Sequence, residues 1–285
     1  MEIENHLPYP TSAPTQLTNL EEIPTPDTPP WGPFAAIGVW IASVAFILVI
    51  PTLFLLPYIA MQKPPIVDRD QIIEFAKSDP TSIFLQIVAI LPAHFLTLVL
   101  AWIVVTRVRQ FSFRQTLGWE MGGFKWWHFV VLLAAYFAFA MIVGSFFPEQ
   151  ENDLIRIIHS SRSAVYIIAF VATFTAPLVE EVVYRGVLYS AFQRTMGVPG
   201  AFVLVTLLFA VVHVPQYYPS YSTIFLLGVL SLMLTAIRVK TKNLLPCIIL
   251  HTLFNGMQSL LLILEPMMKS AEAPAPAASL LHLIK

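Results

Sequence analysis

The sequence has few charged residues and almost no cysteine. Asp, Glu, Lys and Arg make up 12% of the 285 residues, whereas hydrophobic residues make up 57%. Soluble domains carry about 25% charged residues, so this composition indicates a chain that lies in a lipid bilayer. The single cysteine, Cys247, excludes an intrachain disulfide and a cysteine-rich metal site.

An excess of basic charge is also missing. The chain has 16 Lys and Arg against 17 Asp and Glu, which gives a net charge of −1. Nucleic-acid binding needs a basic surface, so we expect the bilayer and not nucleic acid as a partner. The first residues lack the basic region and short apolar core of a signal peptide, and we expect them to be retained.

Both ends of the chain lack apolar periodicity. Residues 1–33 are rich in Pro and Thr and contain no Lys or Arg, and this composition predicts a disordered Pro-rich tail. Residues 266–285, with the run AEAPAPAAS, predict a second, flexible tail.

Seven apolar stretches are long enough to cross the hydrocarbon core, which takes about 20 helical residues. They are Phe34–Ala60, Ser82–Thr106, Trp127–Phe147, Ala164–Tyr184, Ala201–Val214, Tyr221–Ile237 and Leu244–Leu264. The number could be six or eight, because Pro51 and Pro57 interrupt the first stretch and the fourth continues past Pro177 as a polar helical segment reaching Phe192. The apolar runs do not alternate as membrane β-strands do. We therefore predict an all-α polytopic transmembrane helical bundle of about seven spanning helices.

Ionisable side chains occur together in three of these spans. The fourth contains Glu180, Glu181 and Arg185, the fifth contains His213, and the seventh contains His251. Each such residue costs roughly 2.5 to 3.5 kcal/mol on insertion scales, so each is a candidate functional residue. The sequence therefore predicts a polar site among the fourth, fifth and seventh spans.

Helical geometry predicts how these side chains pair. Glu181 and Arg185 stand four residues apart with the acid nearer the N-terminus, which favours an ion pair. Glu180 lies about 100° around the helix and needs a partner from elsewhere. Counted from a turn near residue 197, Glu180 and His213 lie about 24 to 26 Å along antiparallel helices, so we expect them to meet.

A buried carboxylate beside an imidazole suits a general base that activates water for hydrolysis. Attack on a carbonyl also needs donors for the oxyanion that forms. His251 and Asn255 lie four residues apart on one face of the seventh span, and their imidazole and amide are candidates for these donors.

In these residues the sequence resembles the CAAX-protease and bacteriocin-processing family of intramembrane proteases, also called the CPBP or Abi family. The motifs EExxxR, FxxxH and HxxxN mark that family on successive helices. They occur here in order, over about a third of the chain from Ala164 to Gly256, as Glu180-Glu181-xxx-Arg185, Phe209-xxx-His213 and His251-xxx-Asn255.

The resemblance implies a CAAX prenyl protease-like endopeptidase that cuts membrane-associated or lipidated proteins or peptides within the membrane. It implies that Glu180 is the base, with His213 as its partner. His251 and Asn255 match the positions of the oxyanion donors. The supporting positions are Glu181, Arg185 and Phe209. On this basis we divide the membrane part of the chain into N-terminal transmembrane helices over 34–162 and a CPBP-like catalytic domain over 163–265.

The role of a metal stays open at this point. Glu180, His213 and His251 are potential zinc ligands, so the enzyme could be of the glutamate type or the metallo type. No HExxH motif is present, and all four polar groups have roles without a metal. We therefore expect a metal-free site.

Other functions fit part of the pattern. The polar groups could hold helices together in a non-catalytic membrane scaffold or immunity protein. Buried Glu and His also serve proton-coupled transporters, but the inverted repeats of such proteins are not evident. His94, in the second span beside Pro92, has no partner at helical spacing and is interpreted as structural. We expect a multi-pass protein of the plasma (inner) membrane of a prokaryote.

Overall fold

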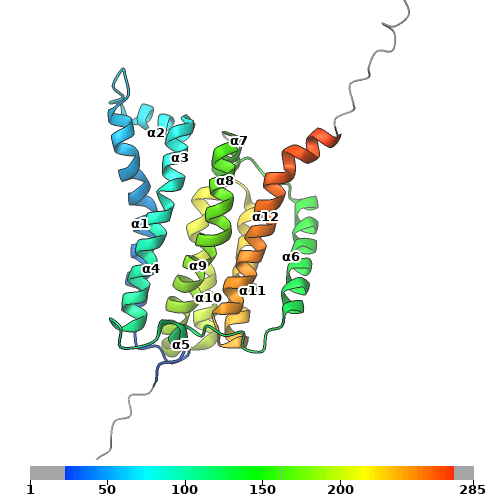
Figure 1. Ribbon diagram of the computed structural model, residues 1–285. Helices are drawn as coiled ribbons and strands as arrows, with labels where there is room; N and C mark the ends of the chain where they lie inside the picture. The colour runs from blue at the N-terminus through cyan, green and yellow to red at the C-terminus, as the bar shows by residue number, and fades with distance from the viewer. Residues whose placement is uncertain (1–22, 161, 273–285) are drawn as a thin grey trace, which may run out of the picture.

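The computed structural model describes residues 23–160 and 162–272, and within these ranges the chain forms helices and no β-strand. Six helices in this part of the chain are long and apolar enough to cross a bilayer: Pro33–Ala60, Pro80–Thr106, Trp126–Phe146, Arg162–Tyr217, Tyr221–Thr241 and Leu245–Leu264. They stand side by side in Figure 1. The prediction of an all-α polytopic bundle is confirmed, and the protein is an integral, multi-pass membrane protein.

The helical segments follow one another with short connections. In chain order they are α1 (Pro33–Ala60), α2 (Arg69–Ser78), α3 (Pro80–Val88), α4 (Ile90–Thr106), α5 (Phe113–Leu117), α6 (Trp126–Phe146), α7 (Asp153–Ser160) and α8 (Arg162–Phe170). The remaining segments are the π-helix η1 (Val171–Thr175), α9 (Ala176–Glu181), the π-helix η2 (Val182–Leu188), α10 (Tyr189–Tyr217), α11 (Tyr221–Thr241) and α12 (Leu245–Glu272).

The longest apolar helix, Arg162–Tyr217, is two passes joined by a turn. The backbone leaves the helical region at Gly197, where φ is 71°, a conformation that glycine adopts without a steric penalty. The ring of Phe209 lies 5.2 Å from that of Tyr184, so the chain folds back on itself after this turn. The fourth and fifth predicted spans are therefore antiparallel, and the six apolar helices provide the seven predicted passes.

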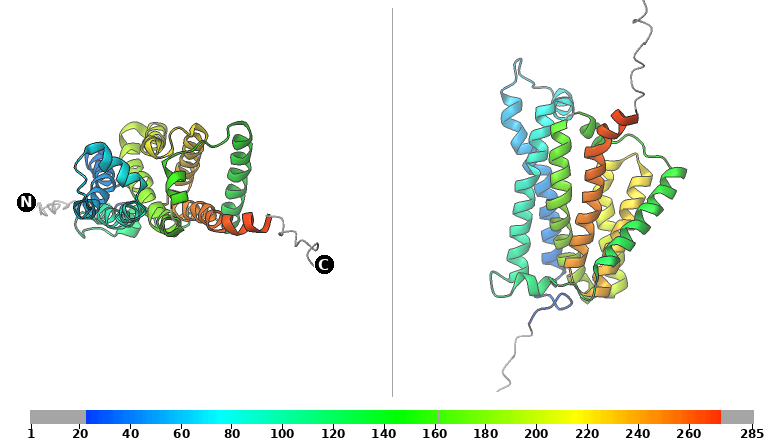
Figure 2. Two further views of the ribbon diagram at one scale, coloured as in Figure 1. Left: turned by 90° about the horizontal axis from the view of Figure 1, so that it is seen from above. Right: turned by 45° about the vertical axis from the view of Figure 1, so that its right-hand side comes forward.

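The N-terminal helices pack against the helices that carry the polar motifs. Helix α1 contacts α4 along its length, and both α1 and α4 contact η2. Pro51 and Pro57 lie inside α1 without ending it, so the first predicted stretch is one helix. Helix α6 stands at the outer edge of the bundle, where it contacts α11 and α12 (Figure 2).

The predicted tails are shorter than expected. In the N-terminal segment, Trp31 is 6% exposed and its Nε1 donates a hydrogen bond of 3.0 Å to the carbonyl of Val187. The disorder predicted for 1–33 is therefore wrong for residues 23–33, because this segment binds residues more than 150 positions later in the chain. Helix α12 continues to Glu272, so the tail predicted over 266–285 begins inside a helix. Residues 1–22 and 273–285 lie outside the described residues.

Candidate active site

Glu181 and Arg185 form the ion pair that their spacing predicts. Nη1 of Arg185 donates to Oε1 of Glu181 at 2.9 Å, and neither side chain is exposed. The guanidinium also donates to Ser231 and Thr235 of α11, at 2.6 and 3.3 Å to their hydroxyl oxygens. It lies 4.7 Å from the ring centre of Phe209. A buried charge is stable when it is paired and fully hydrogen-bonded, and Arg185 meets both conditions.

Glu181 has a second partner, on α12. Its Oε1 also lies 2.8 Å from Nδ1 of His251, whose side chain is 3% exposed. The carboxylate paired with Arg185 can only accept, so Nδ1 of His251 carries the hydrogen of this bond. The bond fixes the orientation of the imidazole and leaves Nε2 facing Glu180, with Oε2 of Glu180 at 3.8 Å.

Glu180 is the more accessible of the two acids. Its side chain is 22% exposed, whereas that of Glu181 is fully buried. The 3.8 Å to His251 is longer than a hydrogen bond, and the carboxylate of Glu180 accepts no hydrogen bond from any residue that the structure describes. The two adjacent glutamates thus differ in that Glu181 is buried and bonded through Oε1, whereas Glu180 is partly exposed and unbonded.

Phe209 lies close to the imidazoles of both His213 and His251. The ring of Phe209 is 4.6 Å from that of His213 and 6.1 Å from that of His251. Nδ1 of His213 donates to the carbonyl of Phe209 at 2.6 Å, because a carbonyl can only accept. In the neutral ring Nε2 then has a free lone pair. Among the described residues no direct bond joins His213 to Glu180, so their meeting stays a prediction, and the imidazole found beside Glu180 is that of His251.

Asn255 is held by a carbonyl that a proline leaves free. In the π-helix η1 the N–H of each residue bonds to the carbonyl five positions earlier, as Ala176 does to Val171. The residue five positions after Ala172 is Pro177, which has no N–H. The carbonyl of Ala172 instead accepts a hydrogen bond of 2.7 Å from Nδ2 of Asn255. This bond uses one of the two amide hydrogens of Asn255 and leaves the other.

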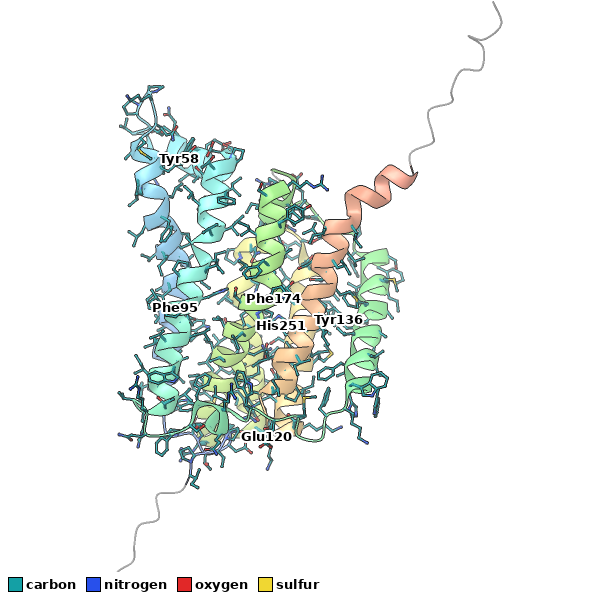
Figure 3. All side chains as sticks on the ribbon, viewed as in Figure 1. Tyr58, Phe95, Glu120, Tyr136, Phe174 and His251 are labelled. Atoms are coloured by element: carbon teal, nitrogen blue, oxygen red, sulfur yellow. The ribbon has the colours of Figure 1, made fainter. Side chains whose placement is uncertain are left out.

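The polar face of α12 extends one turn further than the motif. Ser259, four residues after Asn255, accepts from the hydroxyl of Thr173 at 3.0 Å and donates to the carbonyl of Ala169 at 3.4 Å. We did not predict this residue, although the spacing of four from Asn255 to Ser259 was a signal for it. Figure 3 shows His251 at middle height in the bundle, where α12 faces α9.

The possible zinc ligands of the site can be compared with their placement in the structure. Within residues 23–160 and 162–272, no group of three or more His, Cys, Asp or Glu side chains is placed to bind one metal ion. Nδ1 of His251 and Nδ1 of His213 are both engaged with protein oxygens, which leaves Nε2 as the ring nitrogen open to another partner in each. The choice between the glutamate type and the metallo type stays a prediction.

Comparison with known protein families gives a match to the part of the chain that carries the candidate site. Residues 162–257, from the start of α8 into α12, match the family described as "Type II CAAX prenyl endopeptidase Rce1-like". No curated protein and no solved structure matches the chain. The matched third of the chain contains all three motifs and the residues described above except Ser259. Over residues 162–257, the part that carries its three motifs, the chain is similar to the Rce1-like family of type II CAAX prenyl endopeptidases.

Proposed function

We propose that the protein is an intramembrane endopeptidase that hydrolyses peptide bonds of lipidated or membrane-associated proteins, with Glu180 as the general base. The observation that carries this proposal is the contrast between the two glutamates. Oε1 of Glu181 is held by Arg185 and His251 and the side chain is fully buried, whereas Glu180 stands beside the same imidazole with both oxygens unbonded and with partial exposure. A carboxylate in such a place can bind water and take its proton.

In the first step, a water molecule held by Glu180 attacks the carbonyl carbon of the scissile peptide bond. A carbon–oxygen bond forms, one proton of the water moves to the carboxylate, and the carbonyl electrons move to its oxygen. In the second step, the carbon–nitrogen bond breaks and the proton passes from Glu180 to the leaving amine. Nε2 of His213, with Nδ1 held by the carbonyl of Phe209, is a hydrogen-bond acceptor for the same water.

Side chains of α12 donate hydrogen bonds to the oxyanion that forms in the first step. Asn255 has one amide hydrogen beyond the one that binds Ala172. Because Nδ1 of His251 donates to Glu181, its Nε2 donates to the oxyanion when the ring carries both protons. The Glu181–Arg185 pair therefore acts on the reaction by orienting His251, and preorganised donors of this kind are usually a large part of catalysis.

The substrate class follows from the place of the site and from the family. The polar residues lie in helices that span the bilayer, and side chains around the bundle are apolar and exposed, such as Phe174 and Leu253. A substrate that carries a lipid reaches such a site from within the membrane. We propose a CAAX-type substrate with a prenylated cysteine, and the plasma (inner) membrane of a prokaryote as the location of the enzyme.

The test compares cleavage of two peptides by purified protein in lipid nanodiscs. One peptide ends in a farnesylated CAAX sequence and the other has the same sequence without the lipid, and mass spectrometry detects the released tripeptide. We expect the wild type to cut the farnesylated peptide faster and Glu180→Gln to be inactive. Glu74→Gln, which changes an exposed acid of α2, is the matched control. Equal rates for the wild type and Glu180→Gln would overturn the proposal.

A further inference from the structure

The N-terminal segment covers a group of hydrogen-bond donors that the proposed reaction does not use. Arg238, in the last turn of α11, is fully buried, and its guanidinium lies 5.2 Å from the ring centre of Tyr189. Gln193 of α10 and Lys242, the residue after α11, bind the same part of the N-terminal segment as Arg238. Figure 1 shows this segment at the lower end of the bundle.

Two neighbouring oxygen atoms of the segment are each held by two side chains. The carbonyl of Pro26 accepts from Nη2 of Arg238 at 2.8 Å and from Nε2 of Gln193 at 3.3 Å. Oδ1 of Asp27 accepts from Nη1 of Arg238 at 3.4 Å and from the same Nε2 at 3.2 Å. Nζ of Lys242 lies 3.6 Å from the other carboxylate oxygen. A carboxylate or phosphate presents two oxygens to a guanidinium in this way, so the three donor side chains have the arrangement of an oxyanion site.

The segment fills this site incompletely. The distances from Asp27 to Arg238 and Lys242, 3.4 and 3.6 Å, are longer than the roughly 2.7 to 2.9 Å of a strong charge-assisted hydrogen bond. Nε of Arg238 is buried and has no hydrogen-bond partner among residues 23–160 and 162–272. A buried N–H without an acceptor destabilises the folded state. An anion with more oxygens than Pro26 and Asp27 supply would use more of these donors.

The two oxygens belong to a turn that holds its own shape. Thr25 and Thr28 each donate their backbone N–H to the hydroxyl of the other at 3.2 Å, and the two hydroxyls lie 2.8 Å apart. Beyond the turn, Trp31 anchors the chain through its bond of 3.0 Å to the carbonyl of Val187. The turn can therefore leave the site with its internal bonds intact, and the anchor keeps it close by.

The surroundings of the site favour anionic lipid. The connection between α4 and α6 lies at the same end of the bundle, since the carbonyl of Gly118 accepts from the N–H of Leu244 at 2.7 Å. Its one acid is Glu120, and its basic residues are Arg107, Arg109, Arg114 and Lys125. Basic residues at the end of a membrane bundle attract anionic phospholipids, and the headgroup of each such lipid contains a phosphate.

We propose that Arg238, Gln193 and Lys242 form a binding site for the phosphate of an anionic phospholipid headgroup, which displaces the turn that carries Asp27. Two phosphate oxygens replace the oxygens of Pro26 and Asp27, and a further oxygen is available to Nε of Arg238. Bound lipid and bound turn exclude each other. The lipid composition of the membrane then sets how often the N-terminal segment is open. This site does not depend on the proposed function, because Glu180 takes no part in it.

The test measures how often the turn leaves the site. Pro24, directly before the turn, is buried, so the thiol of Pro24→Cys reacts with a maleimide only when the segment opens. The native Cys247 is fully buried. The labelling rate is compared between nanodiscs of phosphatidylcholine and nanodiscs that also contain phosphatidylglycerol. We expect labelling to be about tenfold faster with phosphatidylglycerol, the increase for a ligand present at about ten times its Kd. Equal or slower labelling would overturn the proposal.

Two matched variants locate the effect. Lys242→Gln removes a cation of the site, whereas Lys240→Gln removes an exposed cation two residues earlier. We expect the ratio of the labelling rates in the two kinds of nanodisc to fall in Lys242→Gln and to stay at the wild-type value in Lys240→Gln. An equal fall in both variants would mean a general attraction of charge and would overturn the site. Asp27→Asn should speed labelling in both nanodiscs, because the turn then has no charge to compete with the lipid.

Inorganic phosphate separates the lipid from a free anion. It is added to phosphatidylcholine nanodiscs, with chloride at the same ionic strength as the control, and we expect no increase in labelling. An increase equal to that with phosphatidylglycerol would overturn the choice of a lipid. Should Pro24→Cys not fold, hydrogen exchange of residues 23–28 in the wild type gives the same comparison. Faster exchange with phosphatidylglycerol supports the proposal, and equal exchange overturns it.

Discussion

Glu181 accepts a hydrogen bond of 2.8 Å from His251, a residue that lies 70 positions later in the sequence and three helices away in the chain. The same oxygen atom accepts from Arg185 at 2.9 Å. One buried carboxylate therefore fixes both a guanidinium of its own helix and an imidazole of α12. Its neighbour, Glu180, meets the other nitrogen of that imidazole without being bound by it.

We expect the two glutamates to fail in different ways when they are changed to glutamine. Glu180→Gln should lower kcat by at least about 10²-fold, since the base is lost, with an unchanged melting temperature. Glu181→Gln should destabilise the protein by roughly 3 to 5 kcal/mol, because it leaves the buried charge of Arg185 without its partner. Peptide cleavage and thermal unfolding in detergent measure the two effects. A stable, inactive Glu181→Gln together with an active Glu180→Gln would reverse the assignment.

Asn255→Ala should lower kcat by about 10² to 10³ with little change in KM, which is the usual effect of losing one oxyanion donor. Part of the stability should also be lost, since the carbonyl of Ala172 loses its donor, at a cost of about 1 to 3 kcal/mol. Ser259→Ala is the matched control, because Ser259 binds the same face of α8 and η1 one turn away. Its kcat should equal that of the wild type. A similar kcat loss in both variants would indicate packing and not oxyanion binding.

We expect activity to be independent of zinc. Purified, tag-free protein should keep its kcat after dialysis against a chelator, and metal analysis should find well below one zinc per chain, since Glu180, His213, His251 and Asn255 each have a role in the proposed reaction without a metal. His251→Ala serves as the reference for background metal. About one equivalent of zinc in the active wild type that is absent from His251→Ala would show a metal site.

The N-terminal segment should contribute measurably to stability through Asp27. Oδ1 of Asp27 accepts from the fully buried Arg238 of α11 at 3.4 Å, and the carbonyl of Pro26 accepts from the same guanidinium at 2.8 Å. Asp27→Asn should destabilise the protein by about 1 to 2 kcal/mol, as for a hydrogen bond to a charged group that is partly exposed. Lys242→Gln, which removes the exposed partner of Asp27, should have little effect. Melting temperatures that rank these two variants in the opposite order would contradict this expectation.

Contacts between residues that are close in the chain could be predicted from the sequence. The pair of Glu181 with Arg185 follows from a spacing of four residues, and the fold-back of Arg162–Tyr217 follows from Gly197 and Pro199. Helical periodicity encodes such contacts directly, because residues four apart share a face.

Contacts between distant helices could not be read from spacing. Ser231 and Thr235, which hold Arg185, looked like ordinary polar residues of an apolar helix. The bond from Asn255 to Ala172 depends on the π-helix η1. The sequence does not indicate whether a helical segment makes α-helical or π-helical backbone hydrogen bonds. Asp27 and Trp31 lie in a segment whose composition predicts disorder, and partners more than 150 positions away keep them in place.

The bond between Asp27 and Arg238 also sets an order of events during synthesis. The two residues are 211 positions apart, and five complete passes and most of the sixth, α11, lie between them. The segment around Asp27 leaves the ribosome first. It bonds to Gln193 and Arg194 at 3.2 and 3.0 Å, but the guanidinium of Arg238 is missing until the end of α11 has been made and inserted. We therefore expect this segment to be cut faster by added protease in nascent chains that stop before residue 238 than in chains that end after α12. Protection should appear in chains that end after α12, and protection of the shorter chains would mean that other residues hold the segment.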